Sequence, residues 1–178
     1  MNTQTNPIVD ITTPLGTISV EIDQQHAPGT AANFLGYVDR GDYDGGRFYR
    51  TVTPDNQPDD TIRIAVIQGG MAEWDNYPRH EATGIPLERT TATGLKHLDG
   101  TISMARMTPD SANSEFFICV GDQPELDFGG KRNPDGQGFA AFGQVVDGMD
   151  VVHAINTSPQ ERQGLKPPIE IVSITRRG

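Results

Sequence analysis

Apolar and polar residues alternate strictly near the start of the chain. Within residues 17–22, isoleucine or valine stands at every second position, and residues 8–13 form a similar run. Alternation with a period of two places the apolar side chains on one face of a β-strand. The intervening Pro14-Leu15-Gly16 is typical of a turn. These segments therefore predict a hairpin with one buried face.

Two later segments carry apolar residues at helical spacing. Pro28 begins the first, where its missing N–H costs nothing, and Gly41 ends it. The second follows an Asp-Gly turn and runs through Val151, Val152 and Ile155. We therefore predict two helices.

Further apolar runs predict strands at residues 47–52, 62–67, 101–105, 116–120, 139–146 and 169–174. Residues 53–61, 129–138 and 164–168 are rich in Gly, Pro or Asp and are predicted to be loops, and residues 71–97 are irregular and polar. About eight strands and two helices at hairpin-like spacing favour a mainly β fold, a barrel or a sandwich whose open ends are covered by helices.

The composition indicates one acidic domain. A chain of 178 residues suits a single domain, which we expect to span residues 1–178 with its core at about 8–175. The formal net charge of −10 argues against a nucleic-acid partner. No apolar run approaches membrane-spanning length, so no membrane partner is expected. Residues 1–7 lack the apolar core of a signal peptide. We expect a cytoplasmic protein, or a periplasmic one if a leader has been removed.

Candidates for metal or thiol chemistry are few. Cys119 is the single cysteine, and its apolar strand pattern predicts a buried, inert thiol. The four histidines, at positions 26, 80, 97 and 153, are far apart, and His80-Glu81 lacks the second histidine of a helical zinc motif. We predict surface or hydrogen-bonded core histidines, and neither a metal nor a cofactor.

The most informative segment is residues 113–121. Glu115 is followed by five apolar or soft residues that end at Gly121, which predicts a short strand with little water on either face. Because side chains alternate across a strand, Phe116 and Phe117 face opposite sides. For this segment alone, plain core is the better interpretation, and the floor of a binding site is the alternative.

Several segments, taken in order, resemble the cyclophilin-type peptidyl-prolyl cis-trans isomerases. They are residues 13–18, 27–34, 45–50, 68–70, 100–106, 114–118 and 142–149. The resemblance extends from about Ile8 to Ile174 and implies an eight-stranded antiparallel closed barrel capped by two α-helices, in agreement with the elements predicted above. It also implies an enzyme that catalyses rotation about X–Pro peptide bonds and assists protein folding.

The resemblance also assigns roles to particular residues. Arg50 would be the catalytic cation that donates a hydrogen bond to the prolyl nitrogen. Phe117 would be the floor of the proline pocket. The implied substrate-binding residues are Val66, Gln68, Ala105, Arg106, Glu115, Phe117, Leu126 and Phe139. For Arg106 the backbone, rather than the side chain, would pair with the substrate. The implied partners are proline-containing peptides and unfolded or folding proteins.

Five positions depart from the family pattern. Ala65, Val66, Glu115, Glu125 and Phe139 stand where family members commonly have phenylalanine, methionine, glutamine, tryptophan and histidine. These changes predict a wider pocket, a weaker isomerase, and weak or no cyclosporin binding. Glu115 is also expected to pair with Arg50 and to restrain turnover.

The main alternative is a proline-peptide binding module or chaperone with little or no isomerase activity. The same substitutions suggest it, because a fold does not determine a function. A monomer is expected, since no further hydrophobic stripe is left unassigned.

Overall fold

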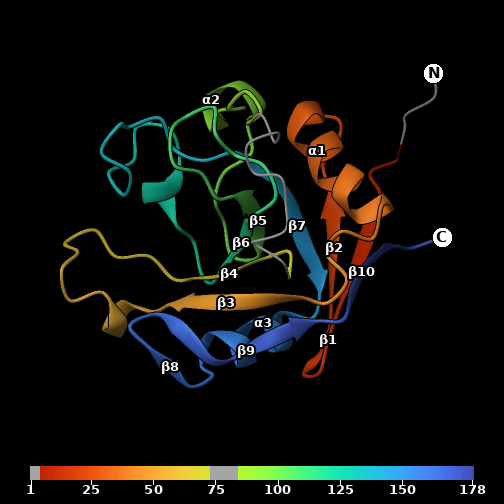
Figure 1. The fold of residues 1–178 in the computed structure, drawn as a ribbon. Helices are drawn as coiled ribbons and strands as arrows, with labels where there is room; N and C mark the ends of the chain where they lie inside the picture. Colours follow the sequence, from red (N-terminus) through yellow and green to blue (C-terminus); the bar gives the residue numbers. More distant parts are fainter. Residues whose placement is uncertain (1–4, 73–83) are drawn as a thin grey trace.

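The strands form one antiparallel sheet in the order β10-β1-β2-β7-β5-β6-β4-β3-β9-β8 (Figure 1). The computed structural model describes residues 5–72 and 84–178. The strands are β1 (Ile8–Thr13), β2 (Gly16–Ile22), β3 (Gly46–Val52), β4 (Val66–Gly70), β5 (Thr101–Met104), β6 (Phe116–Cys119), β7 (Ala141–Asp147), β8 (Gln160–Glu161), β9 (Gly164–Ile171) and β10 (Ser173–Arg176). The predicted hairpin is confirmed by the pairing of β1 with β2.

The two ends of this sheet are connected by the chain itself. β9 pairs with β3, β10 pairs with β1, and only Val172 separates β9 from β10. The N–H of Val172 donates to the carbonyl oxygen of Thr12 in β1 at 2.8 Å. β9 and β10 therefore act as one long strand that brings the ends of the sheet together, which matches the mainly β, barrel-like fold of eight principal strands. The two-residue β8 is an addition to it.

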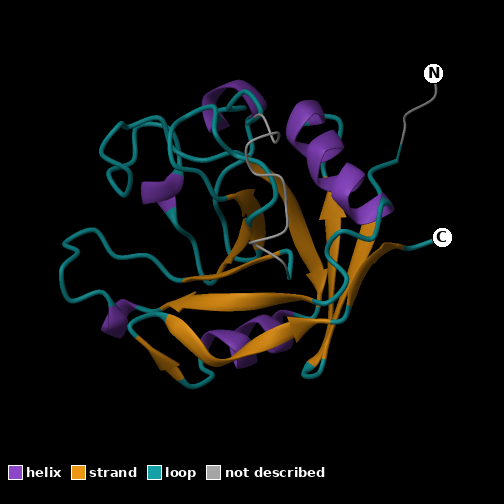
Figure 2. Ribbon diagram, viewed as in Figure 1, coloured by secondary structure: helices purple, strands orange, loops and turns teal. Residues whose placement is uncertain are grey.

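Two of the helices lie on opposite sides of the sheet (Figure 2). They are α1 (Pro28–Asp39) and α3 (Met149–Asn156), and both were predicted. A third helix, the single turn α2 (Thr90–Thr93), lies in the stretch that the sequence predicted to be irregular. No helix in the described ranges is both long and apolar enough to cross a membrane.

The core is organised around one aromatic side chain, Phe116 of β6, which is fully buried. Three rings contact it edge to face: Phe34 of α1 at a centroid distance of 5.6 Å, Tyr43 at 5.5 Å and Phe48 of β3 at 5.8 Å. Edge-to-face packing places the positive rim of one ring on the negative face of another, which stabilises the pair beyond its buried area. This cluster ties α1 to the strands.

The prediction of a strand over residues 62–67 is wrong at its start, because β4 begins only at Val66. Side chains take the backbone groups that a neighbouring strand would otherwise pair with. Gln57 accepts from the N–H of Ile64 at 3.1 Å and donates to its carbonyl oxygen at 2.7 Å, and Arg132 donates to the carbonyl oxygen of Ile62. The backbone before Val66 is thus satisfied without a ladder.

The predicted loop at residues 164–168 belongs to β9 instead. Prolines argue against a central strand because they lack the N–H that a ladder requires. Here Pro167 and Pro168 stand opposite the irregularity at Tyr49 of β3, where the register jumps from Phe48↔Ile169 to Arg50↔Gly164. No ladder bond is required of the two prolines at this point, so the strand tolerates them.

Cys119, at the end of β6, is buried as predicted. Burial, together with the negative charges of Asp127, Asp99 and Asp122, raises the pKa of its thiol far above the ordinary value. The thiolate is the reactive form of cysteine, so this residue is placed as part of the core and not as a nucleophile.

Candidate active site

A hollow of about 160 Å³ opens beside β3, β4 and β6. It is lined by Arg50, Ile64, Val66, Gln68, Ala105, Arg106, Phe117, Leu126, Arg132 and Phe139. The structure therefore brings together the predicted catalytic residue Arg50 and every predicted substrate-binding residue except Glu115. Ile64 and Arg132 were not predicted. A larger hollow of about 260 Å³ lies elsewhere, around Lys96 and Gln144, but neither an arginine nor an aromatic ring lines it.

Phe117 lies against the hollow, with 5% of its surface exposed. It follows Phe116 in β6, so its side chain points to the opposite face from the core cluster. Its ring packs edge to face with Phe139 at a centroid distance of 5.6 Å. The two rings give the hollow an apolar floor and one wall.

A buried histidine supports the Phe117 ring from behind. His97 stacks on it at a centroid distance of 6.0 Å and an interplanar angle of 13°. The two ring nitrogens of His97 lie 2.7 Å from Asp127 and 2.8 Å from the hydroxyl of Ser103. Burial raises the pKa of Asp127, but its hydrogen bonds from His97 outweigh this, and the net shift is downward. His97 is thus a hydrogen-bonded core histidine, one of the two kinds predicted.

No group of three or more His, Cys, Asp or Glu side chains that could hold a metal ion occurs in the described ranges. His80, one of the four histidines considered, lies outside these ranges.

Arg50 is held at the wall of the hollow by two glutamines. Its Nη1 donates to Gln68 Oε1 at 2.8 Å, and its Nε and Nη2 donate to Gln163 Oε1 at 3.1 and 2.8 Å. Burial and, secondarily, repulsion from Arg132 lower the pKa of the Arg50 guanidinium. An arginine nevertheless stays charged at neutral pH. Since its anchors are neutral amides, the charge is not cancelled by a carboxylate.

Gln163 was missed by the sequence analysis, which assigned this part of the chain to a loop. It lies in the turn between β8 and β9 with a positive φ of 73°. The pairing of Arg50 with Gly164 brings Gln163 beside the arginine. Its amide nitrogen donates to the carbonyl oxygen of Asn56 at 3.0 Å, which orients its oxygen toward Arg50. No local pattern marks such a residue, because the register between distant strands creates the contact.

The predicted direct pair between Glu115 and Arg50 is not found in the described ranges, where the guanidinium bonds to Gln68 and Gln163 instead. Glu115 lies 3.4 Å from Gln68 Nε2, which also donates to the hydroxyl of Tyr49 at 2.8 Å. Burial and the negative charge of Glu115 raise the pKa of that hydroxyl well above its usual value. Glu115 lines a neighbouring hollow and reaches the Arg50 site through Gln68, which contacts both residues.

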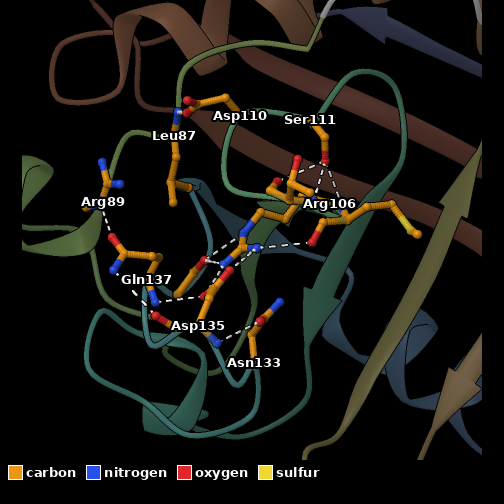
Figure 3. Close-up of polar contacts among 11 residues, drawn as sticks. Leu87, Arg89, Arg106, Asp110, Ser111, Asn133, Asp135 and Gln137 are labelled. Atoms are coloured by element: carbon orange, nitrogen blue, oxygen red, sulfur yellow. Dashed lines mark hydrogen bonds and ion pairs between the residues drawn. The ribbon is translucent and has the colours of Figure 1, made fainter.

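The side chain of Arg106 is turned into the loop at residues 129–138 (Figure 3). Its Nη1 and Nη2 donate to the two carboxylate oxygens of Asp135 at 2.9 and 3.0 Å, and its Nε donates to the carbonyl oxygen of Gly138 at 2.9 Å. The guanidinium carbon lies 4.8 Å from the centre of the Phe139 ring. Only 1% of this side chain is exposed, so Arg106 anchors the loop.

The two long loops meet at Arg132. Its Nη1 donates to Gln57 Oε1 and to the carbonyl oxygen of Ile62, both at 2.7 Å, and lies 3.3 Å from Asp60. Glu125, expected to stand in the place of a tryptophan, accepts from the N–H of Lys131 at 2.7 Å and is not part of the lining. Residues 53–61 thus hold Arg132 of the other loop in its place at the hollow.

A β-barrel-like sheet covered by helices, with an arginine beside an aromatic-floored hollow, defines a cyclophilin-like protein. The model of the family "Cyclophilin type peptidyl-prolyl cis-trans isomerase/CLD" matches residues 8–176. The chain therefore belongs to the cyclophilin-type peptidyl-prolyl cis-trans isomerase family.

Curated bacterial relatives have similar sequences over most of their length. The peptidyl-prolyl cis-trans isomerase of Acinetobacter baylyi is 36% identical, over 95% of this chain and 85% of its own. Peptidyl-prolyl cis-trans isomerase A of Dickeya dadantii is 37% identical, over 90% of this chain and 76% of its own. Peptidyl-prolyl cis-trans isomerase B of Escherichia coli is 35% identical, over 90% and 93%.

Solved structures agree on the fold. A cyclophilin-type peptidyl-prolyl cis-trans isomerase of Cryptosporidium parvum superposes with a TM-score of 0.75 at 21% identity, covering 97% of this chain and 98% of that one. A structure of the same kind, determined in the presence of the dipeptide Ala-Pro, gives a TM-score of 0.74 at 22% identity, covering 96% and 99%.

Proposed function

We propose that this chain catalyses rotation about X–Pro bonds of peptides and folding proteins in the hollow between Arg50 and Phe117. The observation that carries the proposal is a charged guanidinium, anchored by neutral amides, at the wall of an aromatic-floored hollow. Family membership supports the reaction, and the geometry supports the assignment of roles to residues.

The reaction requires stabilisation of a twisted amide. The planar X–Pro bond has partial double-bond character and a barrier of about 18–20 kcal/mol. When the bond twists, the prolyl nitrogen regains a lone pair that can accept a hydrogen bond. Each terminal nitrogen of Arg50 uses one N–H for its glutamine anchor in the described part of the chain, and so retains a second one for this lone pair. This bond exists only in the transition state, and therefore it lowers the barrier.

The other lining residues of the hollow would bind the substrate. Phe117, Leu126 and Val66 offer apolar surface to a proline ring, which contributes about 1–3 kcal/mol when such a group is buried. Gln68 Oε1 is engaged by Arg50, so the substrate contact falls to its Nε2, whose 3.4 Å contact with Glu115 is the weaker of its two bonds. Gln68 would then both hold the arginine and bind the peptide backbone.

The test is cis/trans exchange of an Ala-Pro peptide, followed by NMR with catalytic amounts of protein. An isomerase accelerates exchange and broadens the proline resonances. A binding module shifts the resonances on titration but leaves the exchange rate at its uncatalysed value, and that result would favour the alternative over the proposed function.

Gln163 is proposed as a positioning residue for Arg50. Gln163→Met keeps the length of the side chain but removes the oxygen that accepts two guanidinium N–H groups. Hydrogen bonds to charged groups are worth about 1.5–3 kcal/mol, so kcat is expected to fall about 10-fold or more. KM should change little, because the proline-binding surface stays intact. A raised KM with unchanged kcat would contradict this role, and Gln163→Glu, which keeps an acceptor, should restore part of the rate.

Weak binding of cyclosporin is also proposed. The small Val66 lines the hollow, and the Glu125 carboxylate turns toward the N–H of Lys131, so neither adds the apolar contact that a methionine or a tryptophan would supply. The expected result is no inhibition of exchange at cyclosporin concentrations equal to that of the enzyme. Stoichiometric inhibition would contradict it.

A further inference from the structure

A second guanidinium, that of Arg132, lines the hollow together with Arg50. It comes from the loop at residues 129–138, and only 14% of its side chain is exposed. After burial, repulsion from Arg132 is the main cause that lowers the pKa of the Arg50 guanidinium. Arg50 and Arg132 thus both contribute positive charge to the lining of the hollow.

The contacts that anchor Arg132 involve one nitrogen of its guanidinium, Nη1, and leave Nε and Nη2 for other partners. Both of its hydrogen bonds and its ion pair with Asp60 use Nη1. Within the described ranges, Nε and Nη2 donate to no side chain or carbonyl group, and no buried side-chain nitrogen there lacks a partner. These two nitrogens are therefore not fully buried, and their N–H groups are left to bind an acceptor on a substrate.

The charges around the hollow do not balance. Three of its lining residues are arginines and none is a carboxylate. Arg106 is neutralised by its two-point contact with Asp135, whereas Arg50 is bonded only to amides. Asp60, the partner of Arg132, is nearly half exposed, and its 3.3 Å contact is loose. A positive excess therefore faces the substrate in a chain whose net charge is −10.

The position of Arg132 is fixed before any substrate arrives. The N–H groups of Lys131 and Arg132 donate to the Glu125 side chain and carbonyl oxygen at 2.7 and 3.2 Å. Gln57, which receives the guanidinium, is itself buried and bonded to Ile64 at both ends of its amide. A charge that is already oriented costs little reorganisation on binding, so it discriminates well between ligands.

We propose that Arg132 makes this enzyme select substrates that carry an acidic residue either two positions before the proline or directly after it. A carboxylate there would accept from Nε and Nη2 in the two-point geometry that guanidinium groups favour. It would also relieve the repulsion between Arg132 and Arg50. This inference rests on the proposed function, because it concerns the peptide bound in the same hollow.

The experiment compares kcat/KM for matched Ala-Pro peptides that carry Glu, Gln or Lys immediately before Ala or immediately after Pro. In wild-type protein, Glu at one of these positions is expected to exceed Gln by about 10-fold and Lys by more, given the strength of charge-assisted hydrogen bonds. The preference should shrink in 0.5 M salt, which screens partly exposed charges. Arg132→Gln should remove the preference while turnover of the Gln peptide persists.

Arg63→Gln is the matched control, since Arg63 is exposed, donates to the carbonyl oxygens of Asp60 and Pro54 in the loop that contacts Arg132, and does not line the hollow. This variant should keep the preference for Glu. Arg132→Lys should keep part of the preference, and it serves as a second test in case Arg132→Gln fails to fold. Equal rates for the Glu and Gln peptides, or a preference that survives Arg132→Gln, would overturn the inference. If no peptide is turned over, the proposed function fails instead, and the dissociation constants of the same peptides decide the inference.

Discussion

Replacing Arg50 with alanine is expected to lower kcat/KM for an Ala-Pro peptide by about 100- to 1,000-fold, the usual cost of removing one preorganised transition-state donor. Most of the loss should be in kcat, because the hydrogen bond to the prolyl nitrogen exists only when the amide is twisted. Peptide affinity should persist, since Phe117 and the other apolar lining residues are untouched. The measurement is the NMR exchange rate at saturating and at limiting peptide.

Two variants make this result specific. Arg40→Ala removes an exposed arginine that pairs with Asp42 and does not line the hollow, and it should leave the rate unchanged. Arg50→Lys keeps a positive charge but loses the fork that engages both Gln68 and Gln163, so an intermediate rate is expected. An Arg50→Ala protein that retains full activity would remove Arg50 from the mechanism.

Replacing Phe116 with alanine is expected to destabilise the protein by about 3–5 kcal/mol, the range found for large aromatic side chains lost from cores. Such a loss is a large part of the roughly 5–15 kcal/mol by which domains are stable. The expected cost lies at the high end because Phe34, Tyr43 and Phe48 all contact this ring, and removing it leaves a cavity that their fixed strands and helix cannot close. The free energy of unfolding, measured by urea titration, tests this.

The matched control is Phe128→Ala. Phe128 is 43% exposed, so the same truncation there should cost far less. A change below about 1 kcal/mol for Phe116→Ala would show that the aromatic cluster does not hold α1 to the barrel. Phe116 and Phe117 are adjacent on one strand, but Phe116 belongs to the core and Phe117 lines the hollow, so their substitution should affect stability and activity respectively.

Local patterns were sufficient for most of the fold. The alternation in residues 17–22 and the helical spacing after Pro28 show which side chains are buried. The structure has β2 and α1 at these positions, as predicted. Periodicity works because burial repeats with the geometry of the element. It was wrong for residues 62–65 and 164–168, where side-chain hydrogen bonds and an irregular register, rather than burial, decide the backbone.

The residues of the candidate site likewise fall into those that the sequence predicted and those that only the structure revealed. Arg50, Gln68 and Phe117 lie in short segments whose resemblance to a family was visible along the chain, and the structure brings them to one hollow. Gln163 is 113 residues from Arg50, and Arg132 is 75 residues from Gln57, so neither contact leaves a periodic trace in the sequence.

The amino-acid sequence by itself determined most of the strands, the two longer helices and the family, because these depend on burial patterns and short motifs. Only the tertiary structure decided which groups anchor Arg50, what supports the Phe117 ring, and that a second guanidinium, that of Arg132, lines the hollow. The physical reason is that hydrogen bonds and charge interactions act between neighbours in space, and barrel register and loop packing choose those neighbours.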